Sequence, residues 1–264
     1  MNNINLMLGD CLERMKEIES GIVDMILTDP PYGTTACKWD SIIPFEPMWA
    51  ELKRIIKSNG AIVLFGGEPF SSALRMSNIK QYKYDWIWEK SKVGNIFNCK
   101  NAPQKNFENI IVFSEGTIAN GSIRKMPYFP QDLIKVDIKR SNTAKSSIKG
   151  TINERPSRLN SSSYKQSFTN YPRQILRFNN QQGFHPTQKP VALLEYLIKT
   201  YTQENETVLD FTMGSGSTGV ACVNTGRHFI GIEQEEKYFL VAQERIALAG
   251  AEKDRQPDLF GGAA

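Results

Sequence analysis

Short apolar runs recur along the chain, and the longer stretches between them carry apolar residues at every third or fourth position. Several runs are unbroken series of β-branched and other apolar residues, which is typical of strands in a sheet buried on both faces. The predicted strands are Ile4–Leu8, Ile22–Thr28, Ala61–Phe65, Tyr84–Trp88, Asn109–Phe113, Thr207–Leu209 and Phe229–Ile232. The pattern therefore predicts a sheet of seven strands.

The stretches between these runs have helical spacing and recognisable helix ends. Asn59-Gly60 follows one of them as a stop signal, and Pro190 suits the first turn of another. The predicted helices are Cys11–Ile18, Glu46–Ile56, Pro190–Tyr201 and Glu235–Ala249. Strands that alternate with helices predict an α/β fold with a doubly wound sheet.

Composition narrows the class of protein. The chain has 264 residues, of which 40% are hydrophobic, so it can bury one sizeable core. No apolar run reaches the roughly 18 residues that span a bilayer, and the N-terminus lacks the features of a signal peptide. Four cysteines without a C-x-x-C pair, and only two histidines, argue against a structural zinc site or a disulfide framework. We therefore expect a cytoplasmic protein without a metal.

The formal net charge of +4 conceals a strongly basic segment. Residues 116–184 contain twelve Lys and Arg but three Asp and Glu, a net charge of +9, whereas the rest of the chain has a net charge of −5. Within this segment, 141–163 has few large apolar residues, and aromatic residues flank it on both sides. Basic residues interleaved with aromatic ones suit a polyanionic partner with unstacked bases, although a solvated loop would show the same charge.

A glycine-rich motif follows the strand at Thr207–Leu209 and reads Asp210-Phe211-Thr212-Met213-Gly214-Ser215-Gly216-Ser217-Thr218-Gly219. Glycines allow a tight turn and close backbone approach to a ligand, and the next helix starts with free N–H groups. Glu233 ends the following strand, where an acid accepts hydrogen bonds from ribose hydroxyls in folds of this type. The series predicts a site for an adenosine-containing cofactor.

The glycine spacing also fits the dinucleotide fingerprint G-x-G-x-x-G, which taken alone favours NAD. Only 45 residues follow Gly219, too few for the remaining strands of a dinucleotide fold. Strands from earlier in the chain must therefore complete the sheet in a permuted order. This chain order disfavours an NAD-dependent oxidoreductase.

A second motif, Asp29-Pro30-Pro31-Tyr32, directly follows the strand at Ile22–Thr28. In open α/β sheets the carboxyl ends of the strands border the ligand site, and two prolines fix the backbone there. The Asp29 carboxylate and the Pro30 carbonyl are two hydrogen-bond acceptors beside the flat ring of Tyr32. This combination suits an exocyclic amino group on a planar base, whereas a proline turn with a surface acid would be the structural alternative.

The ordered pair of motifs resembles the β class of DNA amino-methyltransferases, which transfer methyl from S-adenosylmethionine to adenine N6 or cytosine N4. Asp29–Tyr32 precedes Phe211–Thr218 with the basic segment between them, and supporting matches occur at 8–11, 60–65 and 185–190. Thr212-Met213 departs from the family pattern, in which Pro and a small residue are common. The resemblance covers roughly residues 4–115 and 185–247.

The resemblance implies a Rossmann-like S-adenosylmethionine-dependent methyltransferase fold with a seven-stranded, mostly parallel sheet in permuted order and a small basic target-recognition insert. We expect residues 1–115 to form the catalytic half, 116–184 the insert, 185–250 the cofactor-binding half and 251–264 a flexible C-terminal tail. Homodimers are common in families of this kind.

The resemblance also assigns roles to individual residues. The catalytic motif is Asp29, Pro30, Pro31 and Tyr32, and the expected cofactor-binding residues are Asp10, Cys11, Thr187, Lys189, Asp210, Phe211, Gly214, Ser215, Gly216, Ser217, Thr218 and Glu233. Among these, Asp10 could instead cap the following helix, and Cys11 could be ordinary packing. DNA is expected to meet the insert at Lys139, Arg140, Lys145, Lys149, Arg155, Arg158, Lys165 and Arg173.

The expected reaction is direct methyl transfer to the N6 amino group of an adenine that is flipped out of the duplex and stacked on Tyr32. Within the family, Asp as the first motif residue favours adenine over cytosine. Cytosine-N4 methylation, RNA- or protein-directed methylation and a catalytically silent DNA-binding protein remain alternatives. Nothing in the sequence specifies the target site.

The end of the chain carries a further motif, Gln256-Pro257-Asp258-Leu259-Phe260. It resembles the short peptide by which bacterial proteins dock on the sliding clamp, and an apolar Leu-Phe pair on a tail suits a groove on a partner. The same tail could fold back on its own domain. We therefore expect double-stranded DNA as a partner, with clamp binding as a hypothesis, and a location at the nucleoid.

Overall fold

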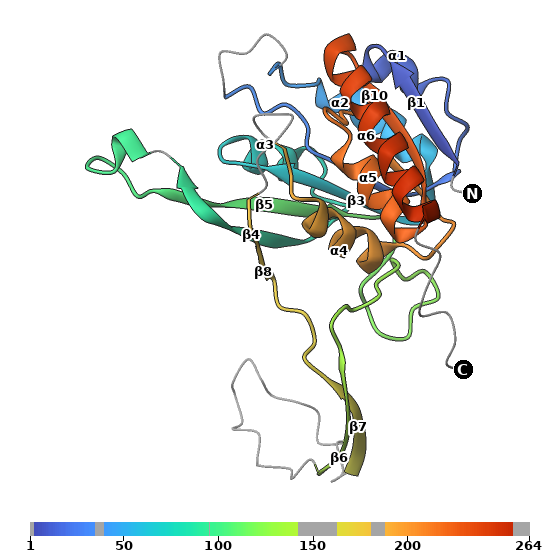
Figure 1. Ribbon diagram of the computed structural model, residues 1–264. Coiled ribbons are helices and arrows are strands. Elements are labelled where there is room, and N and C mark those ends of the chain that lie inside the picture. The colour runs from blue at the N-terminus through green and yellow to red at the C-terminus, as the bar shows by residue number, and fades with distance from the viewer. Residues whose placement is uncertain (1–2, 35–39, 95, 142–162, 181–187, 256–264) are drawn as a thin grey trace. The chain divides into compact units, whose positions relative to one another are not determined.

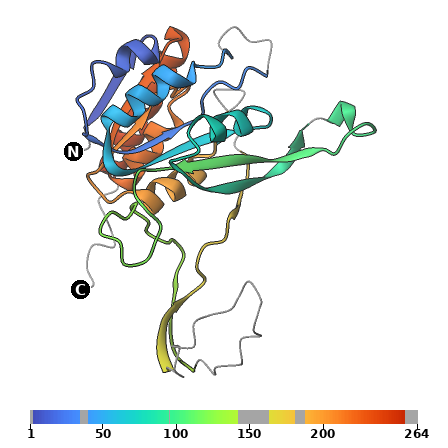
Figure 2. The same ribbon diagram turned by 180° about the vertical axis from the view of Figure 1, so that it is seen from behind.

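The computed structural model describes residues 3–34, 40–94, 96–141, 163–180 and 188–255. The chain forms two compact units, Met1–Phe129 together with Gln174–Ala264, and Pro130–Arg173. Figures 1 and 2 show the larger unit, in which helices cover both faces of one sheet.

Eight strands of the described residues form this sheet, in the order β1-β10-β9-β2-β3-β5-β4-β8. The strands from β1 to β3 are parallel, β5 runs antiparallel to both of its neighbours, and β8 is parallel to β4. Their bounds are β1 (Ile4–Leu8), β2 (Val23–Thr28), β3 (Ile56–Gly66), β4 (Tyr82–Gly94), β5 (Lys105–Phe113), β8 (Ile175–Phe178), β9 (Thr207–Asp210) and β10 (His228–Glu233).

The strand order confirms the permuted topology, because β9 and β10 from the C-terminal part of the chain lie between β1 and β2. All seven predicted strands form. The eighth, β8, comes from the segment that the sequence assigned to the basic insert, and it pairs with β4 at Ile87–Lys90. Only four residues long, this edge strand has just one buried residue, Leu176, so its apolar pattern is too short to predict a strand from the sequence.

The helices divide between the two faces of the sheet. Helices α1, α2 and α3 pack against one face, where Val23 and Ile26 of β2 point, and α4, α5 and α6 pack against the other, where Met25 and Leu27 point. Their bounds are α1 (Cys11–Met15), α2 (Phe45–Ile55), α3 (Phe70–Ser77), α4 (Val191–Tyr201), α5 (Ser217–Thr225) and α6 (Glu236–Arg255), and a 3₁₀ turn, η1, spans Ile96–Asn98.

Three helices differ from the sequence prediction. Helix α1 ends at Met15, three residues before the predicted end at Ile18. Helix α3 was not predicted, because its eight residues include three serines and only Phe70 and Leu74 give it large buried apolar side chains. Helix α6 continues to Arg255 and so includes the first residues of the predicted tail. Within the described residues, no helix is both long and apolar enough to span a lipid bilayer.

The smaller unit, Pro130–Arg173, contains a two-stranded antiparallel ribbon of β6 (Ile134–Ser141) and β7 (Ser163–Thr169). Its basic residues lie opposite one another or opposite aromatic residues, with Lys139 paired with Lys165 and Arg140 with Tyr164. This unit is narrower than the insert 116–184 expected from charge, since the described residues 116–129 and 174–180 belong to the larger unit.

Candidate active site

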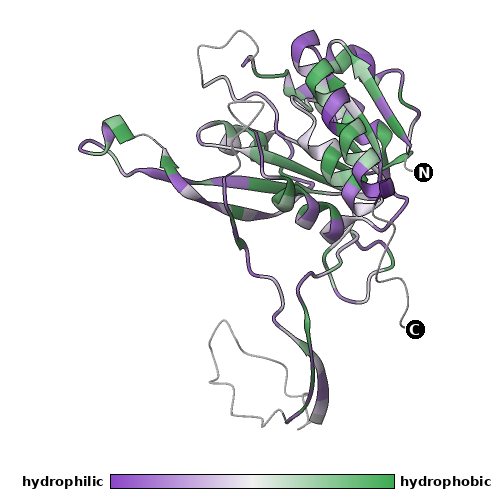
Figure 3. Ribbon diagram, viewed as in Figure 1, coloured by the Kyte–Doolittle hydropathy of each residue, from purple (hydrophilic) through white to green (hydrophobic). Residues whose placement is uncertain are grey.

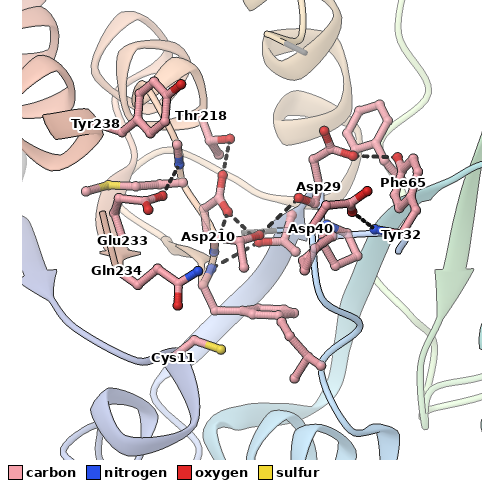
Figure 4. Close-up of a pocket in the computed structure, with 18 of the residues that line it drawn as sticks. Cys11, Asp29, Tyr32, Asp40, Phe65, Asp210, Thr218, Glu233, Gln234 and Tyr238 are labelled. Carbon is pink, nitrogen blue, oxygen red and sulfur yellow. Dashed lines mark hydrogen bonds between the residues drawn. The ribbon is translucent and has the colours of Figure 1, made fainter. Parts of the chain in front are cut away.

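One cavity of about 580 Å³ lies at the sheet edge where β1, β2, β9 and β10 end (Figure 4). The carboxyl ends of parallel strands meet at this edge, so motifs far apart in the sequence become neighbours. The predicted residues that line it are Asp10, Cys11, Asp29, Pro30, Pro31, Tyr32, Lys189, Asp210, Phe211, Gly214, Ser215, Ser217, Thr218 and Glu233. The structure thus brings the catalytic motif and the cofactor motif together in one cavity.

The buried Asp210 carboxylate connects the two motifs. It accepts hydrogen bonds from the Thr28 hydroxyl, from the Thr218 hydroxyl at 2.6 Å and from the Thr212 N–H at 3.1 Å. The Thr28 oxygen in turn accepts the Phe211 N–H at 3.0 Å, and the Thr212 hydroxyl donates to the Asp29 carbonyl at 3.1 Å. Strand β2, which ends at the catalytic motif, is therefore held in register with the start of the glycine-rich turn.

Asp29 lies in a chain of buried charges. One carboxylate oxygen accepts the Tyr32 hydroxyl and the other the Lys189 ammonium, whose Nζ is also 3.3 Å from a Glu108 oxygen. Burial raises the pKa of Asp29, and the nearby Lys189 opposes that rise. Burial alone would lower the pKa of Lys189, but the two carboxylates outweigh it and raise the pKa, so the lysine stays charged.

Glu108 joins this cluster from strand β5. No sequence pattern singles it out, because its role depends on β5 running antiparallel, which brings the start of that strand to the carboxyl edge of the sheet. Lys90 of the neighbouring strand also binds Glu108. Burial would raise the pKa of Glu108, but Lys189 and Lys90 reverse that effect and lower it.

The loop that carries Tyr32 is held in place by Asp40, which belongs to neither sequence motif. The Asp40 carboxylate accepts the backbone N–H groups of Tyr32, Gly33 and Thr34, each at 2.8 Å. The ring of Tyr32 stacks on Phe70 with ring centroids 5.1 Å apart. Asp40 and Phe70 therefore set the position of the tyrosine beside Asp29.

Glu233 closes the other end of the cavity. Its two oxygens accept the Gly214 N–H at 2.9 Å and the Glu235 N–H at 2.8 Å, and burial raises the pKa of its carboxyl. Gly214 has a φ of +53°, and a Cβ built there would meet no atom within 4 Å. The glycine-rich turn therefore leaves open space beside a carboxylate that has further lone pairs to offer.

Two predicted cofactor residues also have structural tasks. Asp10 caps α1, because its carboxylate accepts the Leu12 N–H at 2.9 Å and the Glu13 N–H at 3.2 Å, and it lines the cavity as well. Burial raises the pKa of the Cys11 thiol to about 12, so it contributes a neutral surface to the cavity wall. Asp10 can therefore cap α1 and lie in the expected cofactor site at the same time.

Gly216 is the one described member of the cofactor set that does not line the cavity. Its φ is +77°, and a Cβ there would lie 2.8 Å from the Cβ of Ala242 in α6. The sequence also missed Arg245 of α6, whose guanidinium donates to the hydroxyls of Ser215 at 2.9 Å and Ser217 at 3.2 Å. Both residues hold the glycine-rich turn against α6.

The remaining predicted site residues fall into two groups. Lys139, Arg140, Lys165 and Arg173 belong to the smaller unit, where Lys139, Arg140 and Lys165 are exposed on the β6–β7 ribbon. Outside the described residues lie Thr187, Lys145, Lys149, Arg155, Arg158 and the tail motif residues Gln256, Asp258, Leu259 and Phe260.

The residues present fit an adenosine-containing cofactor. The cavity volume falls within the range of roughly 300–1,000 Å³ that is typical of ligand sites. Glu233 offers acceptors for ribose hydroxyls, Gly214 leaves the backbone accessible, and Cys11 gives an uncharged wall. The donor and acceptor set therefore agrees with the expectation from the sequence.

Comparison with known proteins identifies the family. The family model described as DNA methylase matches residues 23–244, which is most of the chain. The chain therefore belongs to the DNA methylase family, and the protein is a DNA methyltransferase.

Individual relatives agree with this assignment. The Type II methyltransferase M2.MboI of Moraxella bovis is 28% identical over 92% of this chain and 87% of its own length. The DNA adenine methyltransferase YhdJ of Escherichia coli is also 28% identical, over 91% of this chain and 82% of its own length. Both alignments therefore cover most of this chain and most of the relative.

Solved structures share the fold. The M1.HpyAVI complex with SAM has a TM-score of 0.61 at 24% identity, covering 92% of this chain and 99% of that one. The PvuII cytosine-N4-specific DNA methyltransferase has a TM-score of 0.62 at 14% identity, covering 96% and 93%. At these identities the likeness establishes the fold alone.

The buried Asp210 carboxyl predicts a pH-dependent contribution to stability. Burial raises its pKa from 3.8 to about 6, so the folded state binds the proton more tightly than the unfolded state, and this contribution is lost as the pH rises through 6. Asp210→Asn lacks this titration. The unfolding free energy of the wild type, minus that of the variant, should fall by about 2 kcal/mol between pH 4 and pH 7.

Urea unfolding of both proteins at several pH values measures this difference. Hydrogen bonds that the variant loses shift its stability by the same amount at every pH, so they do not imitate the effect. Parallel stability curves for the two proteins would show that Asp210 does not titrate in this range.

Proposed function

We propose that this enzyme transfers a methyl group from S-adenosylmethionine directly to the N6 amino group of an adenine flipped out of duplex DNA. The observation that carries the proposal is the shared cavity, which Asp29 and Tyr32 of the catalytic motif line together with Phe211 of the glycine-rich motif, with Glu233 at its other end. A donor held by the second motif would thus face an acceptor held by the first.

S-adenosylmethionine supplies an activated methyl group on a positively charged sulfur. Phe211, Gly214 and Ser217 would surround its methionine end, Glu233 would accept hydrogen bonds from its ribose hydroxyls, and Asp10 and Cys11 would lie beside its adenine. Lys189 was expected near the carboxylate of the cofactor, and Thr187 lies outside the described residues. Because the Nζ of Lys189 binds Asp29 and Glu108, we assign it instead to the acceptor side of the cavity.

The protein prepares the amino group for attack. The N6 lone pair of adenine is delocalised into the ring, which makes the nitrogen a poor nucleophile. The Asp29 carboxylate and the Pro30 carbonyl would accept its two hydrogens, favour a pyramidal nitrogen and orient it toward the methyl group. Positive charge then develops on the nitrogen next to Asp29, whose carboxylate is already in place to stabilise it.

The burial and the charges around Asp29 act on its ionisation in opposite directions. Burial favours the neutral acid, which would be a poor acceptor, and Lys189 opposes that tendency. A lysine at this point would also repel the charge that develops on the nitrogen. Glu108 binds the same ammonium and so offsets its charge.

Tyr32 has two tasks in this arrangement. Its hydroxyl donates to Asp29, and burial raises the pKa of the phenol well above its usual value, so it remains a neutral donor. Its ring, stacked on Phe70, provides a flat surface on which a flipped base would lie.

Adenine is favoured over cytosine as the target base. Asp29 begins the catalytic motif, as in the adenine-directed members that the motif resembles, and the relative YhdJ is named as an adenine methyltransferase. Because other relatives are Type II methyltransferases, we place the enzyme in restriction–modification chemistry. Cytosine N4 is the alternative that the product analysis below distinguishes.

Asp29→Asn keeps the size of the side chain but removes its charge, and we expect it to lower methyl transfer at least about a hundredfold. The assay supplies labelled S-adenosylmethionine and unmethylated genomic DNA, and mass spectrometry identifies the modified nucleoside. N6-methyladenine is the expected product. Asp24→Asn, the same substitution in strand β2 just before the motif, is the matched control and should stay active.

Two results would contradict the proposal. N4-methylcytosine as the product would overturn the choice of base. Unlabelled DNA from a wild-type enzyme that still binds S-adenosylmethionine would overturn the assignment of the acceptor.

Lys189→Met removes the positive charge that opposes protonation of Asp29. The pKa of Asp29 should then rise further, so the acidic limb of the kcat–pH profile should move to higher pH by at least about one unit. Profiles measured at saturating S-adenosylmethionine test this, with Lys199→Met in the following helix α4 as the control. An acidic limb that stays in place would show that Lys189 does not set the ionisation of Asp29.

We also propose that the tail motif docks on a sliding clamp. We further propose that the enzyme acts at the nucleoid and that two copies form a homodimer. Leu259→Ala combined with Phe260→Ala should abolish co-purification with purified clamp, because the apolar pair would enter its groove. Undiminished co-purification would remove the clamp from the list of partners.

A further inference from the structure

Strands β4 and β5 continue past the part of the sheet that carries the cavity. They remain paired as far as Glu89 with Phe107, and again at Gly94 with Lys105, and the turn η1 lies between their ends. Figure 1 shows this hairpin projecting beyond the rest of the sheet of the larger unit. We call the described residues 90–94 and 96–107 the hairpin arm.

The tip of the arm exposes large apolar side chains. Phe97 is 102% exposed and Ile96 is 60% exposed, and in Figure 3 the turn η1 is hydrophobic while the loop beside it is hydrophilic. Because the ring of Phe97 is fully exposed, it adds no buried apolar surface to the fold. At the end of a projecting hairpin, two adjacent apolar side chains of this kind are accessible to a partner.

The charge of the arm indicates what that partner is. Residues 90–107 contain four lysines and neither Asp nor Glu. Lys90 is occupied by Glu108, whereas Lys92, Lys100 and Lys105 are exposed. An acid-free basic arm complements a polyanion, and the substrate of this enzyme is DNA.

The arm also begins at the active site. Lys105 and Glu108, near the start of β5, line the same cavity as Asp29 and Tyr32. A duplex whose adenine enters this cavity would therefore continue along the arm.

We propose that the hairpin arm is a DNA-contacting element separate from the basic insert. Lys92 and Lys100 bind phosphates of the duplex, and Phe97 with Ile96 packs against the bases exposed where the target adenine leaves the stack. The wedge role rests on the base flipping proposed above, whereas the phosphate contacts require only that the enzyme binds duplex DNA.

A second copy of the chain is the other occupant that an exposed apolar tip could attract. Two arms packed against each other would bring six exposed lysines together without an acid on either arm. That repulsion favours DNA over self-association.

Two double variants separate the contributions. Lys92→Ala with Lys100→Ala should weaken binding to a short mixed-sequence duplex about tenfold and reduce the salt slope of the binding constant by about 2, since each phosphate contact contributes about 0.9. Ile96→Ala with Phe97→Ala should lower methyl transfer to genomic DNA at least about tenfold, while S-adenosylmethionine binding stays unchanged.

The controls are equally exposed residues elsewhere. Lys53→Ala with Lys80→Ala matches the charge change, and Ile118→Ala with Ile123→Ala matches the loss of apolar surface. Both controls should bind and methylate DNA as the wild type does. Comparison with the wild type in the same assays keeps the test independent of whether the product is N6-methyladenine or N4-methylcytosine.

Wild-type DNA affinity, salt slope and methylation in both arm variants would overturn the proposal. A loss of oligomeric mass in light scattering for Ile96→Ala with Phe97→Ala, at unchanged DNA affinity, would also overturn it and identify the tip as an interface between copies. Weaker binding by the lysine variant with full methylation by the apolar variant would retain the phosphate contacts and reject the wedge.

Discussion

The Asp210 carboxylate is the interaction on which the arrangement of the site depends. The strands that carry the two motifs are about 180 residues apart in the chain, and only their pairing in the sheet makes them neighbours. Three donors converge on this one carboxylate, from β2, from the glycine-rich turn and from α5. Because a buried carboxylate without those donors would be costly, the network favours a single relative position of the two motifs.

The reversal of β5 is the second constraint, because it extends the site beyond the parallel part of the sheet. In a fully parallel sheet, the start of this strand would lie at the opposite edge. Running antiparallel, β5 delivers Glu108 to Lys189 and Asp29, and it begins the hairpin arm at the mouth of the cavity. One change of direction thus places both a charge that balances Lys189 and a projecting basic surface beside the catalytic residue.

The sequence predicted the part of the structure that depends on local patterns. The seven strands and the permuted order follow from apolar runs, glycine spacing and chain order, and the pairing of the two motifs in one site follows from the family resemblance. Helix α3 and strand β8 escaped because each is short and is stabilised by tertiary contacts. Asp40, Glu108 and Arg245 escaped because each acts across the fold on a residue distant in the sequence or on a loop backbone, which no spacing rule encodes.

The placement of Lys189 illustrates a compromise between binding and catalysis. A buried acid that must stay ionised needs a cation beside it, yet a cation near the reacting nitrogen opposes the positive charge that forms there. Sharing the ammonium between Asp29 and Glu108 meets both demands, because the lysine lowers the cost of ionising Asp29 while Glu108 offsets its charge. Lys90 in turn stabilises Glu108, so the charges alternate in sign from the catalytic carboxylate to the base of the arm.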